Sequence, residues 1–226
     1  MLSRKNFIKA TEEFNTLDRH VPAYYFRREF ISESEKTVKI TVAVCGFYEL
    51  YLNGKRITRG FLSPYISNTD HYVYCDEYNV TLSGGRNVIG ILLGNGFQNN
   101  PGGHIWKFDK ASFRSAPSFS LEVTDGENVL LSSDTDFKIF PSPIRSDDYR
   151  FGEHYDARYE IPGWNEADFD DSAWKNALPA KEPKGEIRIA DVEPIVKECE
   201  IAPANIIKCD DGSYIYDFGI SLRYAL

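Results

Sequence analysis

The amino-acid sequence predicts an all-β protein: an antiparallel β-sandwich of jelly-roll type, followed by the start of a second β module. Short segments of alternating polarity recur between turn residues, and few stretches have helical periodicity. The chain also has 14 Tyr and 15 Phe against a single Met, and aromatic residues suit strands. Short strands at this spacing are typical of sandwiches. With 226 residues, 42% of them hydrophobic, the chain is long enough for one sizeable core and part of another.

The first strands are predicted from residues that alternate between apolar and polar. Residues 1–19 are polar and weakly patterned, so we expect an N-terminal extension there. In residues 38–44, Val and Ile occupy every second position, which is the period of a half-buried strand. The strand 47–52 runs into Asn53-Gly54, a pair that favours a tight type I′ hairpin. Residues 55–58 would then form the return strand.

Further strands follow up to residue 140. Residues 72–80 predict a strand that turns at a Ser-Gly-Gly sequence, 83–85. The run 88–93 is almost continuously apolar and is bounded by Gly, which indicates a central strand buried on both faces. Residues 119–131 contain an Asp-Gly pair between two apolar segments and predict another hairpin. Residues 137–140 add one more strand.

The domain organisation is predicted from the end of this strand series. We expect the sandwich to span residues 20–180, where a stretch rich in Pro, Lys and Glu begins. Residues 186–226 hold about three strands, too few to close a core of their own. Residues 181–226 are therefore interpreted as a linker and the truncated start of a second β-sandwich module in a larger protein.

Several motifs occur in an order that resembles a known family. They are YLNGKR (51–56), GFLSP (60–64), NVIGILLGNGF (87–97), GEHYDAR (152–158), PGW (162–164), FDDSAW (169–174) and YIYDFG (214–219). Over about residues 20–220, this order and spacing are similar to the N-terminal β-sandwich region of bacterial α-L-rhamnosidases, which are glycoside hydrolases. The resemblance implies a jelly roll like that of galactose-binding domains.

The resemblance also implies a role without catalysis. In that family the acid and base belong to a helical (α/α) barrel, and hydrolysis inverts the anomeric carbon. The sequence lacks the long amphipathic helices of such a barrel, and no catalytic residue of the family maps onto it. We therefore expect an accessory domain, inactive alone, that supports a downstream catalytic domain acting on terminal α-L-rhamnosides and contributes to substrate recognition. The alternatives are an autonomous carbohydrate-binding module for rhamnose-containing glycans and a purely structural spacer.

A loop rich in amides is the candidate carbohydrate site. Its Asn side chains offer donors and acceptors for hydroxyl groups, and its Gly residues allow close approach of the backbone. An aromatic ring can stack on the apolar side of a sugar, although many members of the resembled family have Trp where this chain has Phe97. The competing interpretation is ordinary turn chemistry. The candidate residues are Asn95, Phe97, Asn99, Asn100, His104 and Trp106.

A charged trio, Glu153, Asp156 and Arg158, lies beside aromatic residues. Such charges are costly to bury unless they pair with one another, and the guanidinium fork can hold two carboxylates. We interpret the trio as a buried structural ion-pair corner that braces the junction between modules, with ligand binding as the alternative. Trp164 and Trp174 are interpreted as core or interface residues.

Composition limits the cofactors and partners. Asn68 and Asp70 are candidates for a structural calcium ion because they offer oxygen ligands; no other cofactor is expected. A net charge of −8 argues against nucleic acid or an anionic membrane as a partner. Residues 1–10 lack the apolar run of a secretory signal, and the four Cys have no metal or redox spacing. These features predict a cytoplasmic location.

Overall fold

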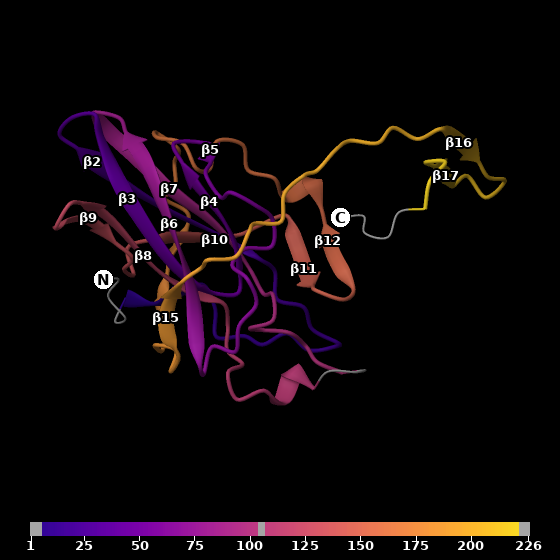
Figure 1. Ribbon diagram of the computed structural model, residues 1–226, viewed down its shortest axis with the longest axis horizontal. Coiled ribbons are helices and arrows are strands. Elements are labelled where there is room, and N and C mark those ends of the chain that lie inside the picture. Colours follow the sequence, from indigo (N-terminus) through magenta and orange to yellow (C-terminus); the bar gives the residue numbers. More distant parts are fainter. Residues whose placement is uncertain (1–5, 104–106, 222–226) are drawn as a thin grey trace. The chain divides into compact units, whose positions relative to one another are not determined.

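The computed structural model describes residues 6–103 and 107–221 and confirms the predicted all-β class (Figure 1). The chain forms two compact units, Met1–Pro194 and Ile195–Leu226. Its strands are β1 (Ile8–Lys9), β2 (Tyr24–Ser32), β3 (Lys36–Cys45), β4 (Phe47–Leu52), β5 (Lys55–Arg56), β6 (Tyr72–Leu82), β7 (Gly85–Gly94), β8 (Ser118–Asp125), β9 (Asn128–Ser132), β10 (Lys138–Pro141), β11 (Ile144–Asp148), β12 (Gly152–Tyr155), β13 (Lys175–Asn176), β14 (Leu178–Pro179), β15 (Glu186–Ile189), β16 (Asn205–Lys208) and β17 (Tyr214–Asp217). Two short 3-10 helices, η2 (Phe108–Lys110) and η3 (Ala157–Tyr159), complete the described elements.

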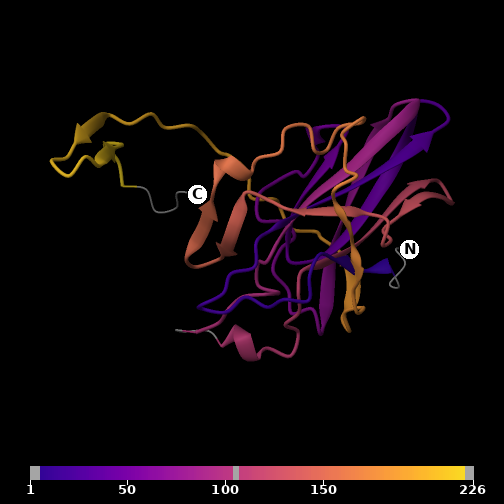
Figure 2. The same ribbon diagram turned by 180° about the vertical axis from the view of Figure 1, so that it is seen from behind.

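The first unit is a sandwich of two sheets, seen from opposite sides in Figures 1 and 2. The first sheet has the strand order β14-β1-β8-β3-β6-β15, with β9 beside β8; the second has the order β13-β10-β2-β7-β4-β5. Alternate residues of β3, from Val38 to Val44, are buried in the core between the sheets. Residues 88–93 lie in β7, inside the second sheet, and are almost all buried, as their apolar run predicted.

The predicted turns are present. Asn53 and Gly54 have φ angles of 49° and 81° between β4 and β5, the positive values that a type I′ turn requires. The Asp-Gly pair of the next hairpin lies between β8 and β9, and Gly126 has a φ of 59°. Local turn chemistry therefore sets the register of both hairpins.

A segment that we call the strap, residues 161–174, covers the outer face of the second sheet. Trp164 and Trp174 are buried there against Tyr25 of β2, as predicted for core residues. The Trp164 ring stacks on Tyr25 with ring centroids 4.2 Å apart. Gly90 of β7 lies beneath this ring, and a Cβ at that position would meet the ring at 2.9 Å. The absence of a side chain at Gly90 therefore makes room for Trp164.

Two short strands lie outside the predicted sandwich boundaries. Ile8–Lys9, in the expected N-terminal extension, forms β1 between β8 and β14. Glu186–Ile189, in the expected second module, forms β15 and pairs in parallel with β6. Ile187 packs against a small cluster that includes Cys75. Each strand is too short to show a period of its own, and each forms only because a longer strand offers it an edge.

The second unit contains one hairpin in its described part. β16 and β17 pair antiparallel, with Ile206 opposite Tyr216, and every strand residue is exposed. A two-stranded hairpin is only marginally stable by itself. Among the described residues, no helix combines the length and apolarity needed to cross a membrane.

Candidate functional site

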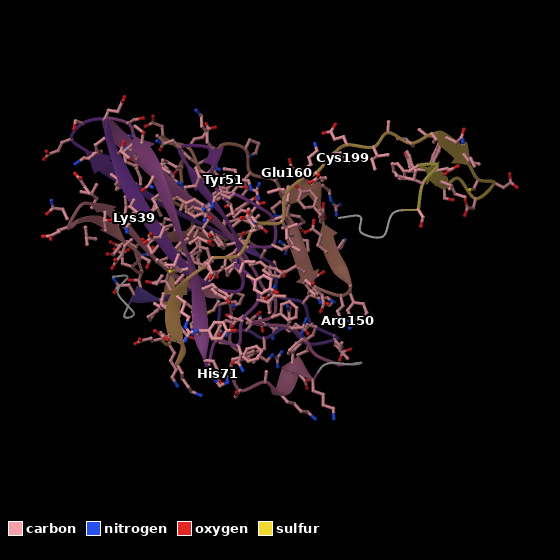
Figure 3. All side chains as sticks on the ribbon, viewed as in Figure 1. Lys39, Tyr51, His71, Arg150, Glu160 and Cys199 are labelled. Atoms are coloured by element: carbon pink, nitrogen blue, oxygen red, sulfur yellow. The ribbon has the colours of Figure 1, made fainter. Side chains whose placement is uncertain are left out.

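Two long loops meet at one end of the sandwich, which we call the loop end. One loop, residues 57–71, leads from β5 to β6, and the other, residues 95–117, leads from β7 to β8. The Thr69 hydroxyl donates a hydrogen bond to Oε1 of Gln98 over 3.0 Å, and the Ser112 hydroxyl donates to the Asp70 carboxylate. In Figure 3, His71 marks this end of β6. The two predicted site loops are therefore neighbours, which their sequences did not indicate.

The amides of Asn95 and Asn99 point into the protein. Both residues are fully buried, with 1% and 0% of their surface exposed. Nδ2 of Asn95 donates to the Val21 carbonyl and to the Asp147 carboxylate, both over 2.8 Å. Nδ2 of Asn99 donates to Oδ1 of Asn95, also over 2.8 Å. These hydrogen bonds assign both side chains to the scaffold of the loop.

The other amides of this loop have a similar role. Nδ2 of Asn100 donates to the Asp148 carboxylate over 3.1 Å, while its Oδ1 accepts from the backbone of Gly102 over 2.9 Å. A buried loop must satisfy its polar groups, and the amides do so here. These hydrogen bonds account for the amides as scaffold groups, and sugar contact by them stays a prediction. His104 and Trp106 lie outside the described residues.

Among the candidate carbohydrate-site residues that the structure describes, Phe97 is half-buried and the three Asn are buried. The ring centroid of Phe97 lies 4.6 Å from that of Tyr149 and 5.3 Å from that of Phe108, and 6.3 Å from that of Phe47. We call these four residues the aromatic cluster. Tyr149 is 47% exposed, and the three Phe are half-buried, so the Tyr149 ring is the part of the cluster that faces solvent. The sequence did not indicate Tyr149 or Phe47, because both are remote from the amide loop along the chain.

The carboxylate of Asp147 fixes β11 to the loop end. Its oxygens accept the backbone N–H groups of Asn95 over 2.9 Å and of Gly96 over 3.0 Å, besides the Asn95 amide. Burial raises the pKa of the Asp147 carboxyl, and these hydrogen bonds oppose that shift. The sequence did not indicate this anchor, which joins residues 52 positions apart.

The variant Asp147→Asn is expected to lose about 1–3 kcal/mol of stability, because its amide nitrogen would face the donors of Asn95. The raised pKa favours the protonated carboxyl in the folded state. The protonated Asp147 carboxyl therefore stabilises the folded state fully when the pH is below the pKa of Asp147 in the unfolded chain. This stabilisation is lost as the pH rises through the pKa of Asp147 in the folded protein. Urea unfolding between about pH 4 and pH 7 should show that the stability of the wild type, measured relative to Asp147→Asn, falls as pH rises.

A matched control for this variant is Glu153→Gln. Glu153 lies on exposed β12 directly opposite Asp147. The variant therefore removes one carboxylate from the same hairpin and leaves the hydrogen bonds of Asp147 unchanged. We expect little change in stability. A wild-type advantage over Asp147→Asn that grew with pH would show that the hydrogen bonds outweigh burial.

The candidate calcium residues form an ion-paired turn. Oδ1 of Asn68 accepts the backbone N–H of Asp70 over 3.0 Å, and Nζ of Lys184 lies 3.3 Å from the Asp70 carboxylate. The hydrogen bond from Ser112 lowers the pKa of Asp70. In residues 6–103 and 107–221, no three His, Cys, Asp or Glu side chains are grouped to hold a metal ion.

The predicted ion-pair corner is at the surface. Nε and Nη2 of Arg158 donate to both oxygens of Asp156 over 2.8 Å and 2.6 Å, and this hydrogen bonding lowers the pKa of Asp156 to about 2. The Arg158 side chain is 86% exposed, and Glu153 lies on an exposed strand. The Arg158 end of the pair is therefore exposed, whereas the Asp156 side chain is 16% exposed. The pair is local, because Asp156 is the N-cap of the 3-10 helix that contains Arg158. Its role at a junction stays a prediction.

A different ion pair in this region is buried. Arg27 of β2, whose side chain is 2% exposed, donates to the carboxylate of Asp171 in the strap. Its Nη2 also donates to the Glu166 carbonyl over 3.1 Å, and its guanidinium lies 5.4 Å from the centre of the Phe169 ring. This pair ties the strap to the second sheet. The sequence indicated the acidic segment but not its partner, which lies 144 residues away.

Comparison with known proteins finds similarity to α-L-rhamnosidases. The family model described as the α-L-rhamnosidase N-terminal domain matches residues 33–198. An α-L-rhamnosidase from Formosa agariphila is 32% identical over 209 residues, which cover 87% of this chain and 22% of that protein. One from Streptomyces avermitilis is 29% identical over 206 residues, covering 87% and 20%. This chain thus spans about a fifth of the length of these relatives.

Solved structures show the same similarity. The α-L-rhamnosidase from Dictyoglumus thermophilum aligns with a TM-score of 0.81 and 30% identity, over 96% of this chain and 25% of that one. The Streptomyces avermitilis α-L-rhamnosidase complexed with L-rhamnose aligns with a TM-score of 0.78 and 25% identity, over 88% and 20%.

Proposed function

This chain belongs to the α-L-rhamnosidase N-terminal domain family, and on that premise we propose that it is a non-catalytic accessory module of an α-L-rhamnosidase-like glycoside hydrolase. In this proposal it supports a catalytic region that hydrolyses terminal α-L-rhamnosides and contributes to recognition of the glycoside. The observation that carries the proposal is the match to an N-terminal domain combined with coverage of about a fifth of the matching α-L-rhamnosidases.

The hydrogen bonding at the loop end supports a role without catalysis. Glycoside hydrolysis needs one carboxyl group as acid and another as base or nucleophile. Asp147 accepts hydrogen bonds from the backbone of Asn95 and Gly96. Asp148 accepts from the Asn100 amide and from the backbone of Arg150. Both carboxylates therefore hold the loops in place.

The aromatic cluster supports a role in recognition. Aromatic rings stack on the apolar faces of sugars, and long loops on a rigid sandwich are common binding surfaces. Tyr149 combines an exposed ring with a phenol that can hydrogen-bond a hydroxyl group. Phe97 and Phe47 pack against it and hold the ring in place.

The first test of this proposal is enzymatic. The 226-residue chain is expected to show no turnover of an aryl α-L-rhamnoside, whereas the full polypeptide encoded by its gene is expected to hydrolyse it. Sustained turnover by the chain alone would reject the non-catalytic role. Inactivity of the full polypeptide toward every α-L-rhamnoside tried would reject the proposed parent activity.

The second test concerns recognition. In the full polypeptide, Tyr149→Ser is expected to raise KM for an extended rhamnoside several-fold with kcat nearly unchanged, because it removes binding but no catalytic group. The control is Ile31→Ser. Ile31 is an exposed apolar residue near the C-terminal end of β2, away from the loop end. Equal KM values for the two variants would contradict a recognition role. Titration of the 226-residue chain with L-rhamnose addresses the alternative of an autonomous binding module, which requires saturable binding that Tyr149→Ser abolishes.

A further inference from the structure

A small hairpin projects from the sandwich without belonging to either main sheet. In the part of the chain that the structure describes, β11 and β12 form a two-stranded sheet of their own. All four residues of β12 are exposed, and η3 follows directly. We call residues 148–160 the arm. Figure 3 shows Arg150 at its tip and Glu160 at its other end.

The hairpin of the arm is rooted firmly in the sandwich, although β12 is exposed. The backbone of Ala23 donates to the Ile144 carbonyl over 3.0 Å, and the backbone of Asp156 donates to the Pro143 carbonyl over 2.9 Å. The buried Asp147 carboxylate adds the bonds to the loop end described above. An isolated two-stranded hairpin is marginal, so these bonds stabilise an element that buries little surface of its own.

The exposed side chains of the arm are held in position. Tyr155 and Tyr159 are each 47% exposed. The Tyr155 hydroxyl donates to the Glu160 carboxylate, and the Arg145 guanidinium lies 4.4 Å from the centre of the Tyr159 ring. Tyr and Arg are enriched among the residues that dominate protein interfaces, and side chains already ordered lose less entropy on binding.

We propose that the arm docks on the remaining part of the α-L-rhamnosidase polypeptide, outside the region matched here. This proposal rests on the proposed function. The matching relatives are four to five times longer than the matched region, so such a parent supplies a large partner surface. Small ligands bind in concave sites, whereas β12 and η3, which carry Tyr155 and Tyr159, form the exposed side of a projecting hairpin, which suits a protein partner.

The charge of the arm defines the chemistry of the partner surface. Four of its residues are Asp or Glu at 148, 153, 156 and 160, against Arg150 and Arg158. Asp156 is already paired with Arg158. Charges across an interface are arranged to be complementary, so the surface that receives Tyr155 and Tyr159 is expected to carry Lys or Arg beside an apolar or aromatic contact.

The experiment is site-specific photo-crosslinking in the full polypeptide encoded by the gene. p-Benzoyl-L-phenylalanine replaces Tyr155 or Tyr159 in turn, and Ile31 at the far end of β2 is the matched control, since it is also exposed and apolar. We expect both arm positions to crosslink to peptides outside residues 1–226. We expect no such crosslinks when the crosslinker replaces Ile31. Crosslinks confined to residues 1–226, crosslinks to a second copy, or no crosslinks would overturn the proposal.

Two further outcomes separate this inference from the proposed function. A full polypeptide that hydrolyses α-L-rhamnosides, but shows no arm crosslinks outside residues 1–226, would overturn the docking surface alone. Arm crosslinks to the rest of a polypeptide without activity on α-L-rhamnosides would support the surface and reject the proposed function. Circular dichroism of each crosslinker variant checks that the sandwich is intact.

Discussion

The variant Asp171→Asn is expected to lower the free energy of unfolding by about 2–4 kcal/mol, the cost of leaving a buried charge without its counter-ion. Arg27 is 2% exposed and Asp171 is 26% exposed, so solvent can replace little of the lost interaction. Burial already lowers the pKa of Arg27, which shows that its surroundings disfavour the charge. Asn keeps the shape of the Asp side chain, so the decrease in the free energy of unfolding measures the effect of removing the charge. Urea unfolding followed by Trp fluorescence measures it, because Trp164 and Trp174 lie in the same strap.

The matched control is Asp168→Asn, three residues earlier in the strap. Asp168 also pairs with an arginine, Arg86, but the two side chains are 79% and 57% exposed, and exposed pairs contribute about 0–1 kcal/mol. Similar losses from Asp168→Asn and Asp171→Asn would show that burial of Arg27 has no energetic consequence. The double variant Arg27→Met/Asp171→Asn should recover part of the loss, because apolar residues can replace both members of a buried pair.

The strands that could be predicted are those whose sequence pattern lies within the strand itself or in the turn beside it. β3 shows the period of two within its own ten residues, and the Asn53-Gly54 turn requires positive φ angles that these two residue types tolerate. β1 and β15 are different, because a strand of two or four residues has no measurable period. They form because β8 and β6 present free edges, and only the folded sandwich brings those edges to them.

The site was harder to predict, because the same residue types serve scaffold and ligand. The composition of the loop 95–103 indicated donors and acceptors for a sugar or for turns, and in the structure these groups bond within the protein. The sequence does not reveal that Asn95 and Asn99 bond to Asp147 and Asn15, which come from distant segments. The ion pair between Arg27 and Asp171 was not predicted, because Arg27 lies in a strand far from the acidic segment along the chain. Partner identity is a property of the tertiary fold in both cases.

The variant Trp164→Ala is expected to destabilise the first unit by about 3–5 kcal/mol, the usual cost of removing a buried Trp side chain. Its ring stacks on Tyr25 at 4.2 Å and meets Tyr51 edge-on at 5.4 Å. It thereby joins the strap to β2 and β4 at once. The loss should appear in thermal unfolding of the 226-residue chain. Phe151→Ala is the control, because Phe151 is 65% exposed and its removal leaves no cavity in the strap.

Gly90 provides an independent check of this packing. The variant Gly90→Ala should cost about 1–3 kcal/mol by overpacking, since its Cβ would lie 2.8 Å from Cβ of Asn165 and 2.9 Å from the Trp164 ring. Gly84→Ala is the control, with its nearest contact at an ordinary 3.4 Å. When combined with Trp164→Ala, the new methyl group enters the space that the ring has left, so the two losses should not add. Strict additivity would mean that Trp164 does not pack on Gly90 in solution.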